Sequence, residues 1–146
     1  MQHESEAFLI VQAGALRCAL PLLQVREVMR PLPVKAASGL APGVLGATVV
    51  RGVPLPVISL TRLLHQPEEQ PRRFVVLRTP GRDCVLAVDA IHSIDRMPAE
   101  TWQQLPNLLR RVESAEQIST EDQDLIVSLS MARILAELPP PEVVQA

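Results

Sequence analysis

Aromatic residues are almost missing from this chain. Phe, Trp and Tyr make up 2% of its 146 residues, and Tyr is absent, whereas apolar residues of all kinds make up 47%. A hydrophobic core must therefore be packed mainly from Val, Leu, Ile and Ala. So few rings leave no platform on which nucleic-acid bases could stack. The formal net charge of −2 provides no basic footprint either, so the composition excludes nucleic acid as an expected partner.

Cysteine is scarce as well. Cys18 and Cys84 are too few for a disulfide framework, and neither belongs to a C-x-x-C motif or has a histidine at metal-ligand spacing. Both lie in apolar runs, where a cysteine behaves as a small hydrophobic residue. The sequence therefore predicts two buried free thiols and no metal site.

Targeting and membrane segments are missing too. The first residues include Glu4 and Glu6 and no cationic start, which does not fit a secretory signal. The apolar stretch over residues 8–23 is interrupted by polar residues such as Arg17, and it is too short to span a membrane. We expect a cytoplasmic protein that does not insert into the membrane directly.

The motifs of catalysis are also absent. The sequence contains no P-loop and no G-x-G-x-x-G. Ser59 and Ser130 lack the G-x-S-x-G context of a nucleophile, so both are interpreted as helix caps. No set of titratable residues converges on one predicted pocket. We therefore predict that the protein is not an enzyme, with no catalytic residues and no cofactor.

What the chain does contain is a strong hairpin pattern over residues 46–64. Two runs rich in Val and Ile, residues 47–50 and 53–58, flank the dipeptide Arg51-Gly52. Such runs favour strands. A charged residue followed by glycine between them is typical of a tight turn, because glycine adopts positive φ without steric cost.

The second strand of this hairpin contains Pro54 and Pro56, which have no N–H to donate to a sheet. The two prolines are separated by one residue, so their missing donors fall on the same side of the strand. We predict that this side is an unpaired edge. Ser59 then caps one helical turn over residues 60–64.

The chain also repeats itself. Residues 8–30 match residues 74–96 without a gap, and the match places Cys18 on Cys84 and Phe8 on Phe74. A polar linker over residues 65–72 separates the halves, and a C-terminal helix is predicted over residues 131–138. We predict one domain over residues 1–146 with pseudo-repeat halves 8–65 and 72–136.

Each half has about five short strands with Pro and Gly turns, which is typical of small closed barrels. Neither half is large enough to be stable by itself, so the two should share a core. We predict one barrel over residues 15–65 and the other over residues 72–125. Residues 8–13 and the C-terminal helix are expected near their junction.

The chain resembles the CheW-like family of bacterial chemotaxis coupling proteins. The resemblance rests on V-R-E-V at residues 25–28, on residues 42–60 and on residues 86–94. Its most specific part is a glycine, then Arg-Gly, then Pro-Val-Ile and a helical turn. Here these are Gly46, Arg51-Gly52 and residues 56–58.

The resemblance implies an all-β fold of two SH3-like five-stranded barrels that share a hydrophobic core, with short helices and a C-terminal helix. It also implies a non-catalytic adaptor. Such proteins link the cytoplasmic tip of a methyl-accepting chemoreceptor to the regulatory domain of a CheA-type histidine kinase. Their expected location is the cytoplasm, with membrane association through receptor arrays.

The same resemblance assigns protein-interaction residues. In the family the Arg of Arg-Gly and the Glu of V-x-E-V are functionally important and lie near the receptor-facing region, which implies this role for Arg51 and Glu27. Gly46, Gly52 and Val25 complete the predicted set. We expect Arg51 and Glu27 to pair across the first barrel, and we place the kinase-facing surface on the strand-connecting loops of the first half.

Some positions depart from the family pattern. The family usually has Asp where Ser59 and Ser130 stand, and residues 48–50 lack its usual Asn. These departures leave open which receptor and kinase are served and what output the pathway has. The alternative function is a divergent stand-alone regulatory β-barrel that binds a different protein or a small ligand.

Overall fold

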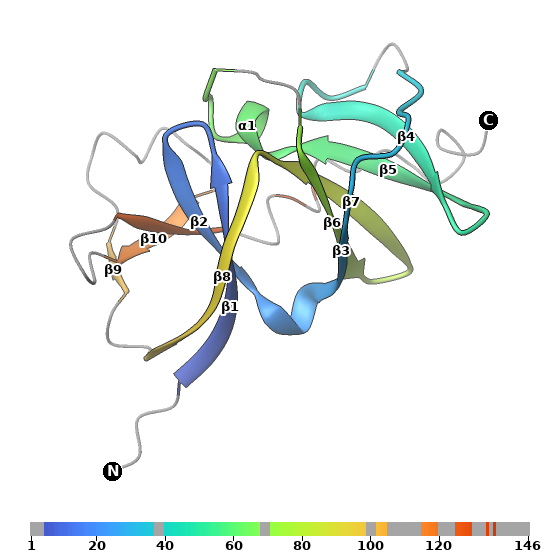
Figure 1. Cartoon of the computed structure of the whole chain (residues 1–146). Helices are drawn as coiled ribbons and strands as arrows, with labels where there is room; N and C mark the ends of the chain where they lie inside the picture. Colours follow the sequence, from blue (N-terminus) through green and yellow to red (C-terminus); the bar gives the residue numbers. More distant parts are fainter. Residues whose placement is uncertain are drawn as a thin grey trace.

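The computed structural model contains two curved β-sheets that lie side by side (Figure 1). It describes residues 5–36, 40–67, 71–98, 102–104, 115–119, 125–129, 134 and 136. The strands are β1 (Ser5–Ala13), β2 (Leu16–Pro21), β3 (Val25–Met29), β4 (Val44–Val50), β5 (Val53–Ser59), β6 (Arg73–Thr79), β7 (Arg82–Val88), β8 (Ala90–Pro98), β9 (Gln103–Gln104), β10 (Ala115–Ser119) and β11 (Ile126–Leu129). The helical elements are the 3-10 turn η1 (Leu22–Gln24) and the helix α1 (Leu60–Leu63).

Strand order confirms an all-β architecture built from two sheets. The six-stranded sheet has the order β8-β1-β2-β11-β10-β9, and the five-stranded sheet has the order β3-β6-β7-β5-β4. The helical turn predicted after the hairpin is present as α1, whose backbone N–H at Arg62 donates to the Ser59 hydroxyl at 3.2 Å. Ser59 is thus the predicted N-cap.

Each sheet contains one hairpin from the half of the chain that does not supply its other strands. The β1–β2 hairpin pairs with β8 and β11, and the β6–β7 hairpin pairs with β3 and β5. The prediction of one barrel over residues 15–65 and another over residues 72–125 is therefore wrong. The two hairpins have similar sequences, so their pattern cannot select between pairing in their own half and pairing in the other. η1 takes the chain out of one sheet and into the other.

The strand pairing repeats as the aligned sequences do. Phe8 lies opposite Asp95 and Phe74 opposite Met29, which are equivalent pairs under the repeat alignment. The β1–β8 ladder has a register shift between Ile10 and Val11, and the β3–β6 ladder has the corresponding shift between Val25 and Glu27. The two sheets are therefore built from equivalent strands, down to the position of the bulge.

Both sheets contribute to one aliphatic core. Its fully buried side chains include Leu20 from β2, Ile58 from β5 and Leu86 from β7. Cys18 and Cys84 lie in the same cluster as free, buried thiols, which confirms the prediction. Burial raises the pKa of Cys18 to about 12, so this thiol stays protonated and unreactive at neutral pH.

The C-terminal part of the predicted fold is described only at a few positions. Ile134 and Ala136 are helical, and Ile134 is fully buried in the shared core. The remaining residues of the helix predicted over 131–138 lie outside the described residues, as does its predicted cap, Ser130. Within the part of the chain that the structure describes, no helix has both the length and the apolarity to cross a membrane.

The edge predicted from the two prolines is present. β5 pairs with β4 along its length but with β7 only from Val57 to Ser59. Pro54 and Pro56 thus have strand partners on the β4 side alone, and the missing N–H groups leave no donor unpaired on the other side. The β4–β5 hairpin extends beyond the rest of its sheet as a result, as Figure 1 shows at the right.

The five-stranded sheet closes on itself through the chain that follows β3. β3 and β4 are its two edge strands. The residues after β3 run alongside β4, where the Lys35 N–H donates to the Ala47 carbonyl at 2.8 Å and the Ala47 N–H donates to the Lys35 carbonyl at 3.0 Å. Closure of this kind protects the edges of a small sheet.

A break in the linker between Pro67 and Pro71 is expected to leave a single folded particle. Each half supplies strands to both sheets, so separated halves would leave both sheets incomplete. A chain with a protease site inserted there should, after complete cleavage, elute from gel filtration with the intact chain. It should separate into two fragments only in denaturant. Two folded fragments that separate in native buffer would contradict the exchanged arrangement.

Candidate protein-interaction site

The tip of the β4–β5 hairpin is the two-residue turn Arg51-Gly52. Arg51 has φ +48° and Gly52 has φ +80°. Positive φ at both central positions is typical of the two-residue turns that suit twisted hairpins. The predicted tight turn is confirmed. An arginine in the left-handed region is uncommon because its Cβ crowds the backbone. The two-residue turn itself requires this conformation, so Arg51 adopts it at a steric cost that the fold tolerates.

The Arg51 side chain is held by a partner on β3. The Arg51 Nη1 donates to the Glu27 Oε2 at 3.0 Å, and its Nη2 donates to the Glu27 Oε1. This is the two-bond fork that a planar guanidinium forms with a carboxylate. The pair joins the hairpin tip to β3, at the junction where the five-stranded sheet closes. The predicted pairing of Arg51 and Glu27 is therefore present.

The pair faces solvent. The Arg51 side chain is 63% exposed and the Glu27 side chain 31% exposed. The hydrogen bond and the negative charge of Glu27 raise the pKa of Arg51 further, and the charge of Asp83 adds to this. The guanidinium thus stays charged at every physiological pH. An exposed pair of this kind adds little to stability and is screened by salt. The pair therefore holds the guanidinium as an oriented, exposed positive charge at the hairpin tip.

Gly46 has a structural role, which is to allow a close approach of the backbone. Its φ is +145°, and a Cβ placed on it would lie 2.1 Å from the Lys35 carbonyl oxygen. Only a residue without a Cβ lets the chain after β3 approach β4 so closely. Gly46 therefore permits the closure of the sheet, and it touches neither Arg51 nor Glu27 in any described hydrogen bond.

Gly52 and Val25 have supporting places around the pair. A Cβ on Gly52 would meet nothing within 4 Å, so only its positive φ requires glycine. Val25 is half-buried at the start of β3 and packs against the shared core. The structure thus brings Arg51 and Glu27 into direct contact, whereas Gly46, Gly52 and Val25 shape the backbone and core that hold them.

Sequence reasoning missed the apolar part of this surface. Val49 and Val53 flank the turn and are 59% and 54% exposed, and Val28, next to Glu27 on β3, is 41% exposed. Val50 lies between the first two in sequence and is buried. Val53 is paired with Val50 across the turn, so Val49 and Val53 lie on opposite faces of the hairpin. Exposed β-branched side chains therefore flank the Arg51 turn on both faces of the hairpin tip.

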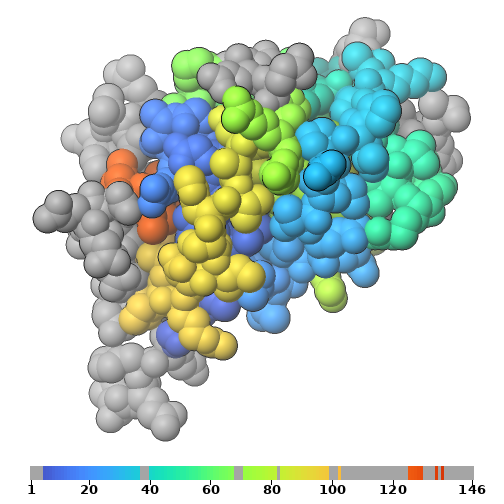
Figure 2. All heavy atoms as spheres, in the orientation of Figure 1, coloured from blue at the N-terminus to red at the C-terminus, as the bar shows by residue number. Residues whose placement is uncertain are grey.

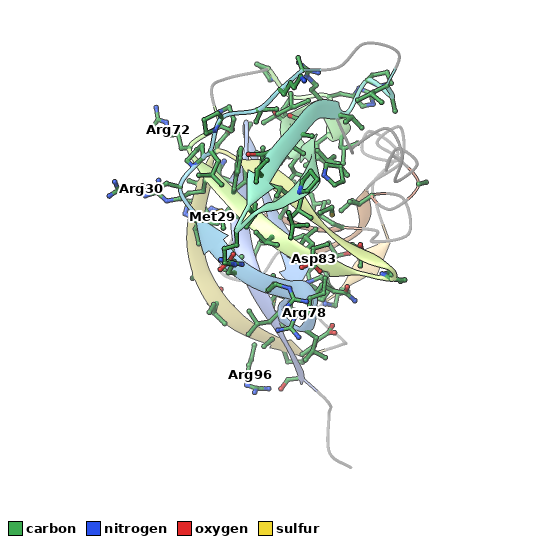
Figure 3. All side chains as sticks on the ribbon, turned by 90° about the vertical axis from the view of Figure 1, so that its right-hand side faces the viewer. Met29, Arg30, Arg72, Arg78, Asp83 and Arg96 are labelled. Carbon is green, nitrogen blue, oxygen red and sulfur yellow. The ribbon has the colours of Figure 1, made fainter. Side chains whose placement is uncertain are left out.

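A second ion pair lies next to the first. The Arg26 Nε lies 2.7 Å from the Asp83 Oδ2, and this pair joins β3 to the start of β7. Asp83 is labelled in Figure 3. Arg26 is the neighbour of Glu27, and its side chain is 45% exposed. No spacing rule in the sequence connects these two residues, because β6 and its turn separate their strands.

Comparison with known proteins agrees with this architecture. A family model described as a CheW-like domain matches residues 7–138. The chain belongs to the CheW-like family. Among solved structures, the crystal structure of the scaffolding protein TtCheW from Thermoanaerobacter tengcongensis superposes with a TM-score of 0.77 and 17% identity, covering 88% of this chain and 90% of that one. At this identity the match shows a shared fold. No curated protein sequence matches the chain.

Membership in the CheW-like family confirms the resemblance seen in the residues. It makes a chemotaxis coupling scaffold the class of this protein. The family is one of non-catalytic scaffolds. The match covers both sheets and the hairpin between residues 44 and 59.

Proposed function

We propose that this CheW-like protein couples the cytoplasmic tip of a methyl-accepting chemoreceptor to the regulatory domain of a CheA-type histidine kinase. The observation that supports this best is the Arg51–Glu27 fork at the tip of the β4–β5 hairpin. In this proposal the protein works in the cytoplasm and is held at the membrane by receptor arrays.

The receptor-facing surface consists of the Arg51–Glu27 pair and the valines around it. Two N–H groups of Arg51 are occupied by Glu27, and a guanidinium has five. The remaining donors are available to carbonyl or carboxylate groups of the receptor. Val49 and Val53 supply apolar area that association would bury. An arginine surrounded by such area is a typical interface hot spot.

The kinase-facing surface is assigned to the strand-connecting loops of the first half. There an end of one barrel would dock on a matching barrel of the kinase. The connection from β2 to β3 supports this placement, because Leu23 in η1 is 85% exposed. A leucine at the surface of a connecting loop offers an apolar anchor for a partner.

Titration calorimetry with each purified partner tests the proposal. The chain is expected to bind both a receptor-tip fragment and the kinase regulatory domain, and to bind them at the same time. Leu23→Ser should weaken kinase binding at least about tenfold, which corresponds to about 1.4 kcal/mol, and should leave receptor binding unchanged. Binding of neither partner by the folded wild-type chain would favour a stand-alone regulatory β-barrel instead.

A further inference from the structure

Several arginines outside the candidate surface have no partner among the residues that the structure describes. The side chains of Arg30, Arg72, Arg78 and Arg96 make no hydrogen bond or ion pair with any residue that the structure describes. Figure 3 shows Arg30 and Arg72 projecting outward on the same side of the molecule, while Arg96 lies at its lower end and Arg78 lies elsewhere. The chain as a whole is acidic, with a net charge of −2. A side with unpaired cations is therefore a local feature that would attract negative charge.

Arg30 and Arg72 form the rim of a groove, because each is next in sequence to a residue that lines it. Its volume is about 660 Å³, within the range of ligand-binding clefts. Pro31 and Pro71 are part of its lining, and they are the chain neighbours of Arg30 and Arg72. In Figure 2 the segment after β3, blue to cyan, and β8, in yellow, occupy the same face of the molecule. The groove thus opens beside guanidinium groups that nothing in the described chain neutralises.

Most of the residues that line the groove are apolar. Leu32, Val34, Leu45, Phe74 and Ala87 contribute side chains to it. The wall formed by residues 31–36 is held in place, because the Thr48 hydroxyl donates to the Pro33 carbonyl at 2.8 Å. The groove is therefore formed before any ligand arrives, which lowers the entropic cost of binding.

The polar groups of the lining already have partners. The Ser59 and Thr61 hydroxyls bond to each other at 2.9 Å. The Asp89 carboxylate accepts a hydrogen bond from the Gly14 N–H at 2.6 Å. A ligand inside the groove thus finds mainly apolar contact, with the Asp89 carboxylate held by the Gly14 N–H, while the positive charges lie at the rim. The matching occupant has an apolar group with negative charges on either side of it.

We propose that this groove binds an acidic peptide segment of a partner protein. An apolar side chain of the segment enters the groove, and flanking carboxylates pair with Arg30 and Arg72. Two guanidinium groups on separate parts of the chain match successive acidic side chains better than they match one small carboxylate ligand. The site shares no residue with the Arg51–Glu27 surface, so it goes beyond the proposed function.

The test uses the full chain, isotopically labelled, and three short synthetic peptides followed by NMR. A peptide of alternating Glu and Leu is expected to shift the resonances of groove residues such as Val34 and Ala87. Peptides with Lys in place of Glu, or Ser in place of Leu, should not. Added salt should weaken the binding, because the charges at the rim are exposed.

Charge reversal then tests whether the arginines at the rim bind the acidic peptide. The double variant Arg30→Glu, Arg72→Glu should lose at least about tenfold in affinity for the Glu-Leu peptide. Arg78→Glu is the matched control, because Arg78 is equally unpaired but lies elsewhere, and it should bind as the wild type does. Circular dichroism and thermal melting confirm that each variant is folded.

Other results would overturn the proposal. Equal binding of the Lys-Leu peptide, or an equal loss in the Arg78→Glu control, would show that the rim charges do not select the ligand. Absence of peptide binding would exclude a peptide site. So would shifts of the groove resonances with the fatty acid decanoate but not with the Glu-Leu peptide. Shifts confined to Arg51 and Glu27 would place the peptide on the other surface. None of these results depends on whether the receptor tip and the kinase domain bind.

Discussion

Gly46→Ala is expected to destabilise the protein more than any other single change proposed for this surface. The new Cβ would lie 2.1 Å from the Lys35 carbonyl oxygen and 2.9 Å from the Ala36 Cα. Both are backbone atoms and cannot rotate away. The chain after β3 must move, so its hydrogen bonds with Ala47 break. Backbone strain of about 1–3 kcal/mol and about 1 kcal/mol for each lost hydrogen bond predict a loss of about 3 kcal/mol or more.

Urea unfolding measures this loss, and Gly52→Ala is the matched control. Gly52 also has a positive φ, of +80°, but an added Cβ there meets nothing within 4 Å. Its alanine variant should lose only the cost of a left-handed alanine, about 1–2 kcal/mol. Equal losses in the two variants would mean that the approach of Lys35 to β4 is not what requires glycine at position 46.

Arg51→Ala is expected to have the opposite profile, with a small effect on stability and a large effect on binding. The Arg51 side chain is exposed, so its removal uncovers no core. The melting temperature should hardly change, while affinity for the receptor-tip fragment falls at least about tenfold. Calorimetry measures both quantities. Arg78→Ala, which removes an unpaired arginine elsewhere, should change neither.

Arg51→Gly separates the effect of losing the side chain from the effect of the left-handed backbone conformation. Glycine relieves the steric cost of the left-handed conformation at this position. This variant should therefore melt at the wild-type temperature or above it, yet lose as much receptor affinity as Arg51→Ala. A sharp fall in melting temperature with intact binding per folded molecule would make Arg51 a structural residue. No change in either quantity would make it a solvated turn residue.

Glu27 is expected to act on the receptor through Arg51. If Glu27 holds the guanidinium in its binding geometry, Glu27→Ala should weaken receptor binding by a smaller factor than Arg51→Ala. The double variant should then bind no more weakly than Arg51→Ala alone, because the two residues act as a unit. Additive losses would show that each residue contacts the receptor independently.

The candidate site was predictable only in part from the residues themselves. The turn at Arg51-Gly52 follows from local chemistry, because a glycine between two Val-rich runs has few other roles. Its partner Glu27 is distant in sequence, and no spacing rule relates a β3 residue to the tip of the β4–β5 hairpin. That pairing was expected only through the resemblance to the CheW-like family. The exposure of Val53 opposite a buried Val50 depends on what packs against the hairpin tip, which composition does not reveal.

The sequence by itself determined the local elements of this protein. The hairpin at residues 44–59, the cap at Ser59 and the buried thiols follow from turn residues, apolar alternation and helix-capping chemistry, all of which act over a few neighbouring residues. The tertiary structure alone decided that the β1–β2 and β6–β7 hairpins exchange sheets. The physical reason is that a strand edge pairs with any complementary edge the chain can reach, and the repeat makes two such edges nearly equivalent. The same long-range closure brings Lys35 against Gly46 and joins Glu27 to Arg51.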